Sequence, residues 1–117
     1  MSRLPLPTEE QLVARLQRGE LAFPPFELRW EEPVSRCVDG IVRMTWRKKS
    51  FRFAVEWKRQ ASPKAIEAAV MQARKQARAA KLLPLVIVPF LEESALDLLE
   101  SKLVSGIDLC GNGLILV

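Results

Sequence analysis

Histidine and tyrosine are both absent from the chain. Without histidine, the protein cannot use a Ser-His or Cys-His nucleophile, a histidine general base or a metal centre with histidine ligands. Without tyrosine, it cannot transfer a nucleic-acid strand through a covalent phosphotyrosyl bond. Any reaction that it catalyses must therefore depend on carboxylates, lysine, arginine or a bound metal ion.

Cysteine and long apolar segments are also scarce. The two cysteines, Cys37 and Cys110, belong to no CxxC pair, so a zinc site is not expected and both are predicted to be buried thiols. No apolar run approaches the roughly 20 residues that cross a bilayer, and the first residues show no apolar signal segment. These features predict a cytoplasmic protein without membrane contact. The length of 117 residues and the hydrophobic content of 49% predict a single domain over residues 1–117.

Positive charge is concentrated in the middle of the chain. Residues 43–81 contain twelve Lys or Arg and two acids, a net charge of +10, whereas the whole chain carries +4. This segregation indicates a surface that meets a polyanion, because Lys and Arg bind phosphate by charge and by counterion release. The alternative is a solvated helix face. The predicted nucleic-acid contacts are Arg43, Arg47, Lys48, Lys49, Arg52, Arg59, Lys64, Arg74, Lys75 and Arg78.

Hydrophobic periodicity and turn residues predict elements in the order α-β-β-β-α-β-α-β-β. The predicted helices span 9–20, 62–81 and 92–102, and the predicted strands span 26–32, 36–46, 51–58, 82–88, 107–109 and 114–117. Thr8 and Ser62-Pro63 supply the start signals of the first two helices. This order predicts an α+β fold, similar to a three-layer α/β arrangement, with a mixed β-sheet flanked by helices.

The segment FRFAVEWK, residues 51–58, alternates between apolar and polar residues, which predicts a strand with one buried face. Because Lys48-Lys49 lacks the Gly or Asn that a two-residue hairpin turn prefers, a four-residue loop is predicted to join this strand to the preceding one. The predicted pairs are Thr45 with Arg52, Ile41 with Glu56, and Asp39 with Lys58. Asp39 and Glu56 then become diagonal neighbours on one face of the sheet.

Two carboxylates on neighbouring strands can share one divalent cation, because diagonal positions lie about 7–8 Å apart and the side-chain tips lie closer. Asp39 and Glu56, with waters and a substrate phosphate, match the oxygen shell of Mg²⁺ or Mn²⁺, and the Trp57 backbone carbonyl could add a ligand. Lys58 is on the same face, where it can hold or deprotonate the attacking water and offset charge on the phosphate. The predicted chemistry is phosphodiester hydrolysis. The alternative is an exposed ion pair between Asp39 and Lys58.

The spacing of these residues resembles that of the PD-(D/E)XK nuclease superfamily. The resemblance rests on Asp39 in VDG, on the ExK element Glu56-Trp57-Lys58 and on the helix that begins at Ser62-Pro63, and it extends over residues 8–88. It implies a restriction-endonuclease-like fold in which the two acids bind Mg²⁺, the lysine assists the nucleophile and the helix lies beside the nucleic acid.

The resemblance also implies accessory residues. The acid that some family members add from the first helix is either Glu9 or Glu10, and the position before Asp39 lacks the proline of the full motif. Gln72 and Gln76 lie where some members use a glutamine, although surface polarity is the favoured interpretation. Trp46 and Trp57 fall on the face away from the acids, so core packing is favoured over base stacking.

Together these features predict a Mg²⁺-dependent endonuclease or exonuclease that acts on nucleic acid, expected to be DNA. Sequence specificity should be low unless the protein forms a homodimer or joins a larger complex. The alternative is a non-catalytic nucleic-acid-binding or regulatory module on the same fold, of a defence or toxin–antitoxin type.

Overall fold

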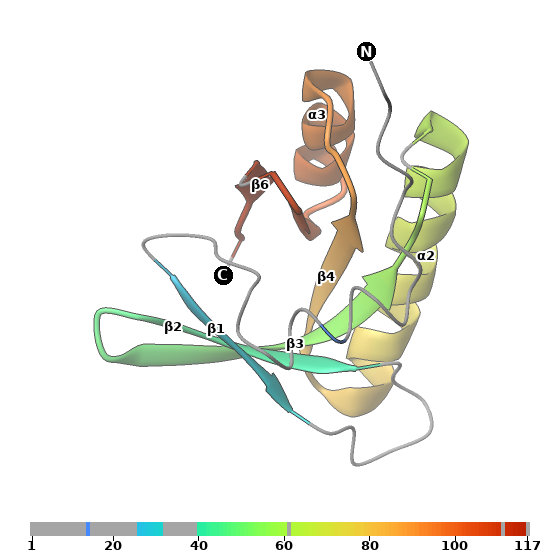
Figure 1. Cartoon of the computed structure of the whole chain (residues 1–117). Helices are drawn as coiled ribbons and strands as arrows, with labels where there is room; N and C mark the ends of the chain where they lie inside the picture. The colour runs from blue at the N-terminus through green and yellow to red at the C-terminus, as the bar shows by residue number, and fades with distance from the viewer. Residues whose placement is uncertain (1–13, 15–25, 32–39, 61, 111, 117) are drawn as a thin grey trace.

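The computed structural model describes residues 14, 26–31, 40–60, 62–110 and 112–116 of the chain (Figure 1). Within these residues, six strands form one mixed sheet whose order in space follows the order in sequence. The strands are β1 (Glu27–Glu31), β2 (Ile41–Trp46), β3 (Lys49–Trp57), β4 (Leu83–Val88), β5 (Ser105–Asp108) and β6 (Gly113–Leu114). The first three pair antiparallel, β3, β4 and β5 pair in parallel, and β6 returns antiparallel to β5. The predicted α+β fold with a mixed sheet is confirmed.

Two helices, α2 (Pro63–Ala80) and α3 (Glu93–Ser101), connect the parallel strands. α2 begins as the sequence predicts: Ser62 is its N-cap and accepts a hydrogen bond from the Ala65 N–H at 3.2 Å through its Oγ, and Pro63 occupies the first turn. The buried stripe of α2 consists of Ile66, Ala69, Val70, Ala73, Gln76 and Ala77. Because half of this stripe is alanine, the helix can lie close to the sheet.

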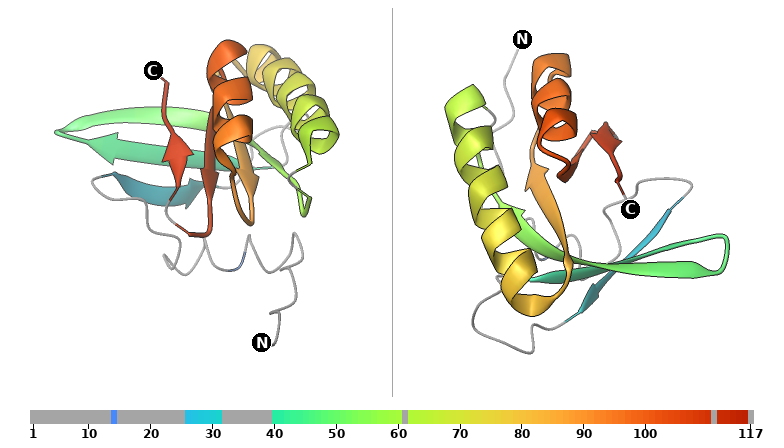
Figure 2. Two further views of the ribbon diagram at one scale, coloured as in Figure 1. Left: turned by 90° about the horizontal axis from the view of Figure 1, so that it is seen from above. Right: turned by 180° about the vertical axis from the view of Figure 1, so that it is seen from behind.

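The two faces of the sheet have different surroundings. Both described helices pack on the same face, where they contact each other and the side chains of Val86 and Val88 (Figure 2). The core on the opposite face consists of Val42, Met44, Phe53, Val55, Trp57, Leu85, Ile87 and Ile107. The apolar face predicted for β3 is therefore confirmed. Arg52 and Glu56 alternate with these residues and project from the face that carries the helices.

The turn between β2 and β3 differs from the prediction. Arg47 and Lys48 alone close the hairpin, and both have a positive φ, 50° and 67°, as a type I′ turn requires. The observed pairs are Arg43 with Arg52, Ile41 with Ala54, and Thr45 with Ser50. The predicted four-residue loop and the predicted pairs are therefore wrong by two residues. A shift of two residues leaves every side chain on its predicted face, because the side-chain period of a strand is two.

Gly40 lies directly before β2, against an indole ring. Its carbonyl accepts a hydrogen bond from the Val55 N–H at 3.0 Å, so the pairing of β2 with β3 continues to this residue. A Cβ atom at position 40 would overlap with the six-membered ring of Trp30. The Trp30 ring in turn packs on Trp57, with ring centroids 5.9 Å apart. Glycine is required here because the ring approaches the backbone closely.

Some predictions fall outside the described residues or are corrected. Of the helix predicted over 9–20 only Ala14 is described, and it is helical; residues 36–39 lie outside the description. The prediction of a buried thiol is wrong for Cys110, which is exposed in the turn after β5. Trp46 is 38% exposed at the tip of the hairpin, so its prediction as a core residue is also wrong. No helix in the described parts is long and apolar enough to cross a membrane.

Candidate active site

Glu56 is a buried carboxylate near the end of β3. It lies opposite Val86 of β4 in the parallel register and is 5% exposed. An ionised carboxylate that loses contact with water is destabilising unless it is paired and hydrogen-bonded. The partners of Glu56 therefore determine what this site can do.

Gln76 approaches Glu56 from the buried stripe of α2. Its Nε2 donates a hydrogen bond to Glu56 Oε2 at 3.1 Å. The residue is 7% exposed, and its Oε1 is buried with no hydrogen-bond partner among the described residues. A buried acceptor that forms no bond costs about 1–3 kcal/mol, and the indole N–H groups of Trp30 and Trp57 are likewise buried without a hydrogen-bond partner among the described residues. Hard divalent cations prefer carboxylate and amide oxygens.

Lys58 lies between the buried Glu56–Gln76 pair and solvent. Its Nζ lies 3.3 Å from Glu56 Oε1, and the lysine side chain is 37% exposed whereas that of Glu56 is 7% exposed. The backbone N–H of Lys58 donates to the Ile87 carbonyl at 3.0 Å, so the residue continues the pairing of β3 with β4. The ammonium is therefore held beside the carboxylate but can meet a molecule that arrives from solvent.

The structure brings together Glu56, Lys58 and Gln76. The other predicted site residues are either outside the described residues or do not join this group. Asp39, Glu9 and Glu10 lie outside the described residues. Trp57 follows Glu56 with its side chain in the opposite core, and Gln72 is exposed on α2. Among the described residues no group of three or more acidic or cysteine side chains is close enough to hold a metal ion. The sequence favoured both glutamines as ordinary polar residues of the protein surface. This prediction is wrong for Gln76, which is buried, and agrees with the exposure of Gln72.

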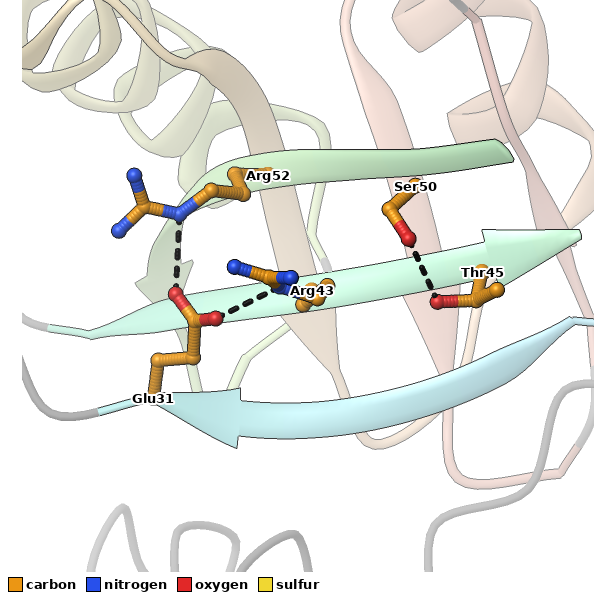
Figure 3. Close-up of polar contacts among 5 residues, drawn as sticks. All are labelled: Glu31, Arg43, Thr45, Ser50 and Arg52. Carbon is orange, nitrogen blue, oxygen red and sulfur yellow. Dashed lines mark hydrogen bonds and ion pairs between the residues drawn. The ribbon is translucent and has the colours of Figure 1, made fainter. Parts of the chain in front are cut away.

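Glu31, at the end of β1, holds two of the predicted nucleic-acid contacts (Figure 3). Its carboxylate accepts hydrogen bonds from Arg43 Nε at 2.7 Å and from Arg52 Nε at 2.9 Å. Burial raises the pKa of Glu31, but the hydrogen bonds from Arg52 and Arg43 outweigh burial and hold the pKa below its usual value of 4.5. The arginine side chains remain 45% and 42% exposed. Glu31 therefore orients both guanidinium groups without removing them from solvent.

Every residue predicted to contact nucleic acid is exposed in the structure. These residues lie on the β2–β3 hairpin, in the loop after β3 and along the outer side of α2. Arg74, Lys75 and Arg78 border a depression of about 400 Å³ together with the exposed Met71. Arg59 borders a second depression of about 490 Å³ beside the start of α2.

A second buried carboxylate, Asp108, was not among the predicted site residues. It is 1% exposed and accepts four hydrogen bonds: from the N–H groups of Leu91 at 2.8 Å, Cys110 at 2.9 Å and Asn112 at 2.8 Å, and from Asn112 Nδ2 at 3.0 Å. These bonds join the loop after β4 to the turn after β5. Because its acceptor oxygens are all occupied, Asp108 has a structural role. The D-x-x-x-N spacing within DLCGN is the sequence signal that indicates such a turn.

Comparison with known proteins provides no further guide. No family model matches the chain, and no curated protein or solved structure is significantly similar to it.

Proposed function

We propose that the protein is a Mg²⁺- or Mn²⁺-dependent nuclease that hydrolyses phosphodiester bonds in DNA. The observation that carries this proposal is the buried Oε1 of Gln76, which has no hydrogen-bond partner among the described residues and lies beside the Glu56 carboxylate and the Lys58 ammonium. We also propose that the chain belongs to the PD-(D/E)XK superfamily. The order of the elements supports this assignment, since three antiparallel strands are followed by α2 and by β4 parallel to β3.

The residues at this site fit a hard divalent cation. Glu56 and Gln76 would contribute a carboxylate and an amide oxygen, and an ion there would occupy the acceptor that is otherwise unpaired. We propose Asp39 as the second carboxylate. Asp39 directly precedes Gly40 in the sequence, and Gly40 pairs with Val55, the residue before Glu56. The bound ion supplies Lewis-acid chemistry and lowers the pKa of water.

Two further ligands are proposed. The Trp57 backbone carbonyl lies on the chain between Glu56 and Lys58, at the end of β3. Glu9 or Glu10 would approach from the helix that the sequence predicts over 9–20. A nuclease site of this kind needs only one or two carboxylates, because waters and substrate phosphate fill the remaining positions of a Mg²⁺ ion.

Lys58 is proposed to act on the phosphate itself. Its partly exposed ammonium can donate hydrogen bonds to the non-bridging oxygens of a phosphodiester that approaches from solvent. These bonds strengthen as water attacks the phosphorus and negative charge builds up on those oxygens, which lowers the barrier. The bond from phosphorus to the leaving oxygen then breaks, the attacking water releases a proton to solvent, and the leaving oxygen gains one.

The exposed arginines and lysines are proposed to hold the rest of the nucleic acid. Arg74, Lys75 and Arg78 line one side of α2, the helix that also carries Gln76. Because phosphate contacts fix the position of a duplex without reading its sequence, a surface of this composition supports binding of low specificity.

The experiment is a cleavage assay with supercoiled and single-stranded DNA in Mg²⁺, Mn²⁺ or EDTA. Cleavage is expected only with a divalent ion, and Lys58→Ala is expected to lower its rate by about 100-fold or more, as removal of a transition-state donor does. Lys102→Ala, an exposed lysine after α3, is the matched control and should retain the wild-type rate. Metal-dependent cleavage that survives in Lys58→Ala would contradict the assigned role.

One observation favours a non-catalytic module as the second candidate. Glu56 already has an ion pair with Lys58 and a hydrogen bond from Gln76, so the carboxylate is satisfied without a ligand. A binding or regulatory module that uses the fold would show salt-sensitive DNA binding without turnover in the same assay.

A further inference from the structure

The turn of the β2–β3 hairpin has residues that do not suit its backbone. Arg47 and Lys48 both lie in the left-handed region, with φ of 50° and 67°. Type I′ turns favour Asn-Gly because a positive φ brings the Cβ atom of most residues too close to the backbone. A left-handed non-glycine residue costs roughly 1–2 kcal/mol, and the exposed residues Lys81 and Leu103 share this conformation, so the charges at the tip have to carry the argument.

The hairpin tip carries cationic groups that form no ion pair with an acid of the described residues. Residues 43–52 contain five Lys or Arg and no Asp or Glu. Arg47, Lys48 and Lys49 are exposed, and no carboxylate of the described residues forms an ion pair with them. The guanidinium carbon of Arg47 lies 4.7 Å from the centre of the Trp46 ring, which leaves its N–H donors available. The tip therefore offers positive charge to a partner that the described chain does not supply.

The shape of the hairpin allows the tip to enter a groove. β2 and β3 extend past the helices on one side of the molecule (Figures 1 and 2). β1 pairs with β2 as far as Thr45, and the tip beyond it consists of the Trp46–Lys49 pair and the two-residue turn, with the Phe26 ring packed on Trp46 at 5.6 Å between centroids. The hydroxyls of Thr45 and Ser50 lie 3.0 Å apart and join the strands at the base of this tip. The major groove of B-DNA is about 12 Å wide and admits a two-stranded β-ribbon.

The tip and the candidate active site lie on the same strand. Lys48 precedes Glu56 by eight residues, a span of about 26 Å at roughly 3.3 Å per residue. This span is shorter than the helical repeat of B-DNA, about 34 Å. One duplex can therefore contact both regions, with Arg43 and Arg52 between them on the face that carries Glu56.

We propose that residues 46–49 form an arm that enters the major groove of duplex DNA. The inference rests on the proposed nuclease function and narrows its substrate to double-stranded DNA. RNA duplexes fit less well because their major groove is deep and narrow, and a single strand offers no groove. Phosphates at the groove edges would be contacted by Arg47, Lys48 and Lys49.

The test measures binding to a labelled duplex of about two helical repeats, by fluorescence anisotropy at several salt concentrations in EDTA. Two double variants separate charge from backbone strain. Arg47→Gln with Lys48→Gln removes the charges and keeps both left-handed residues, whereas Arg47→Asn with Lys48→Gly removes the charges and supplies the residues that the turn prefers. The matched control combines Lys81→Asn with Lys102→Gln. It removes two charges elsewhere, one of them from another left-handed residue, since Lys81 has a φ of 58°.

Both arm variants are expected to lower the slope of log affinity against log salt by about 1.8, because each lost phosphate contact contributes about 0.9. The control should keep the wild-type slope. The Asn-Gly variant should also raise Tm by about 4 °C or more, while the Gln-Gln variant should not. Affinity for single-stranded DNA and for duplex RNA should fall less than affinity for duplex DNA.

An unchanged salt slope in both arm variants would overturn the inference, and so would an equal loss on single strands. The nuclease proposal fails separately. If duplex binding depends on the arm but the protein never cleaves DNA, the arm proposal stands and the nuclease proposal fails. If the protein cleaves DNA but both arm variants bind duplex like the wild type, the nuclease proposal stands and the arm proposal fails.

Discussion

Gln76 provides a sharp test of a cation site, because its Nε2 is hydrogen-bonded to Glu56 whereas its buried Oε1 has no hydrogen-bond partner in the part of the chain that the structure describes. Gln76→Leu keeps a similar volume and removes both. The lost hydrogen bond to a charged acceptor costs about 1.5–3 kcal/mol, and the removal of the unpaired oxygen stabilises the fold by about 1–3 kcal/mol. These effects partly cancel, so in EDTA the free energy of unfolding should change by at most about 2 kcal/mol.

A divalent ion should separate the variant from the wild type. An ion that binds only the folded protein, at 100 times its Kd, raises the free energy of unfolding by about 2.7 kcal/mol. If Gln76 Oε1 is a ligand, its loss should weaken affinity by about 10-fold to 100-fold, by analogy with the loss of groups that orient metal ligands. At the same ion concentration the gain of Gln76→Leu then falls to about 0.4–1.4 kcal/mol.

The assay is urea unfolding followed by tryptophan fluorescence, with Mg²⁺ and with EDTA. Gln72→Leu is the matched control, because Gln72 lies on the same helix but is exposed. It should show the full Mg²⁺ gain of the wild type. An equal gain in Gln76→Leu would refute the assignment of Oε1 as a ligand, and no gain in the wild type would refute the cation site itself.

Three further predictions concern the remaining polar and thiol groups. Because the folded-state pKa of Glu31 is lowered, its carboxylate contributes stability that is present above its usual pKa and lost as the pH falls through the lowered value. Glu31→Gln should therefore be less stable by about 0.5–1 kcal/mol at neutral pH, since both arginines are well solvated. The difference should vanish in acid, and a difference that did not depend on pH would contradict the ion pair. Asp108→Ala leaves the buried Leu91 N–H and three part-buried donors unpaired and should lower the free energy of unfolding by about 3–5 kcal/mol in urea titrations; a loss below about 1 kcal/mol would contradict the structural role of Asp108. Cys110 should react with a thiol reagent in the folded protein, and protection until unfolding would show that it is not exposed.

The sequence predicts the faces of β3 correctly because its alternation is strict. Phe53, Val55 and Trp57 are buried in one core, and Glu56 lies on the other face. The start of α2 is also predicted, since Ser62-Pro63 combines an N-cap with a proline that suits the first helical turn. These elements depend on local pattern, which a single sequence contains.

The register of the hairpin could not be predicted in the same way. Turn preferences describe what is most stable, and Arg47 and Lys48 adopt a turn that they do not favour. The burial of Gln76 had a signal, because it lies three residues after Ala73 and seven after Ala69, on the same stripe of the helix. The polar side chain of Gln76 favoured a prediction of solvent exposure, but its hydrogen bond to the Glu56 carboxylate offsets the cost of burying the amide.

Gly40 links the packing of the two faces of the sheet, because its missing side chain leaves room for the Trp30 ring. Trp30 rests on it and on Trp57, whose neighbours along the chain are Glu56 and Lys58. A methyl group at position 40 would overlap with the Trp30 ring, so the ring or the backbone would have to shift beside Trp57, the residue between Glu56 and Lys58. The contact of Gly40 with the tryptophan pair thus couples the packing of one face of the sheet to the positions of Glu56 and Lys58 on the other.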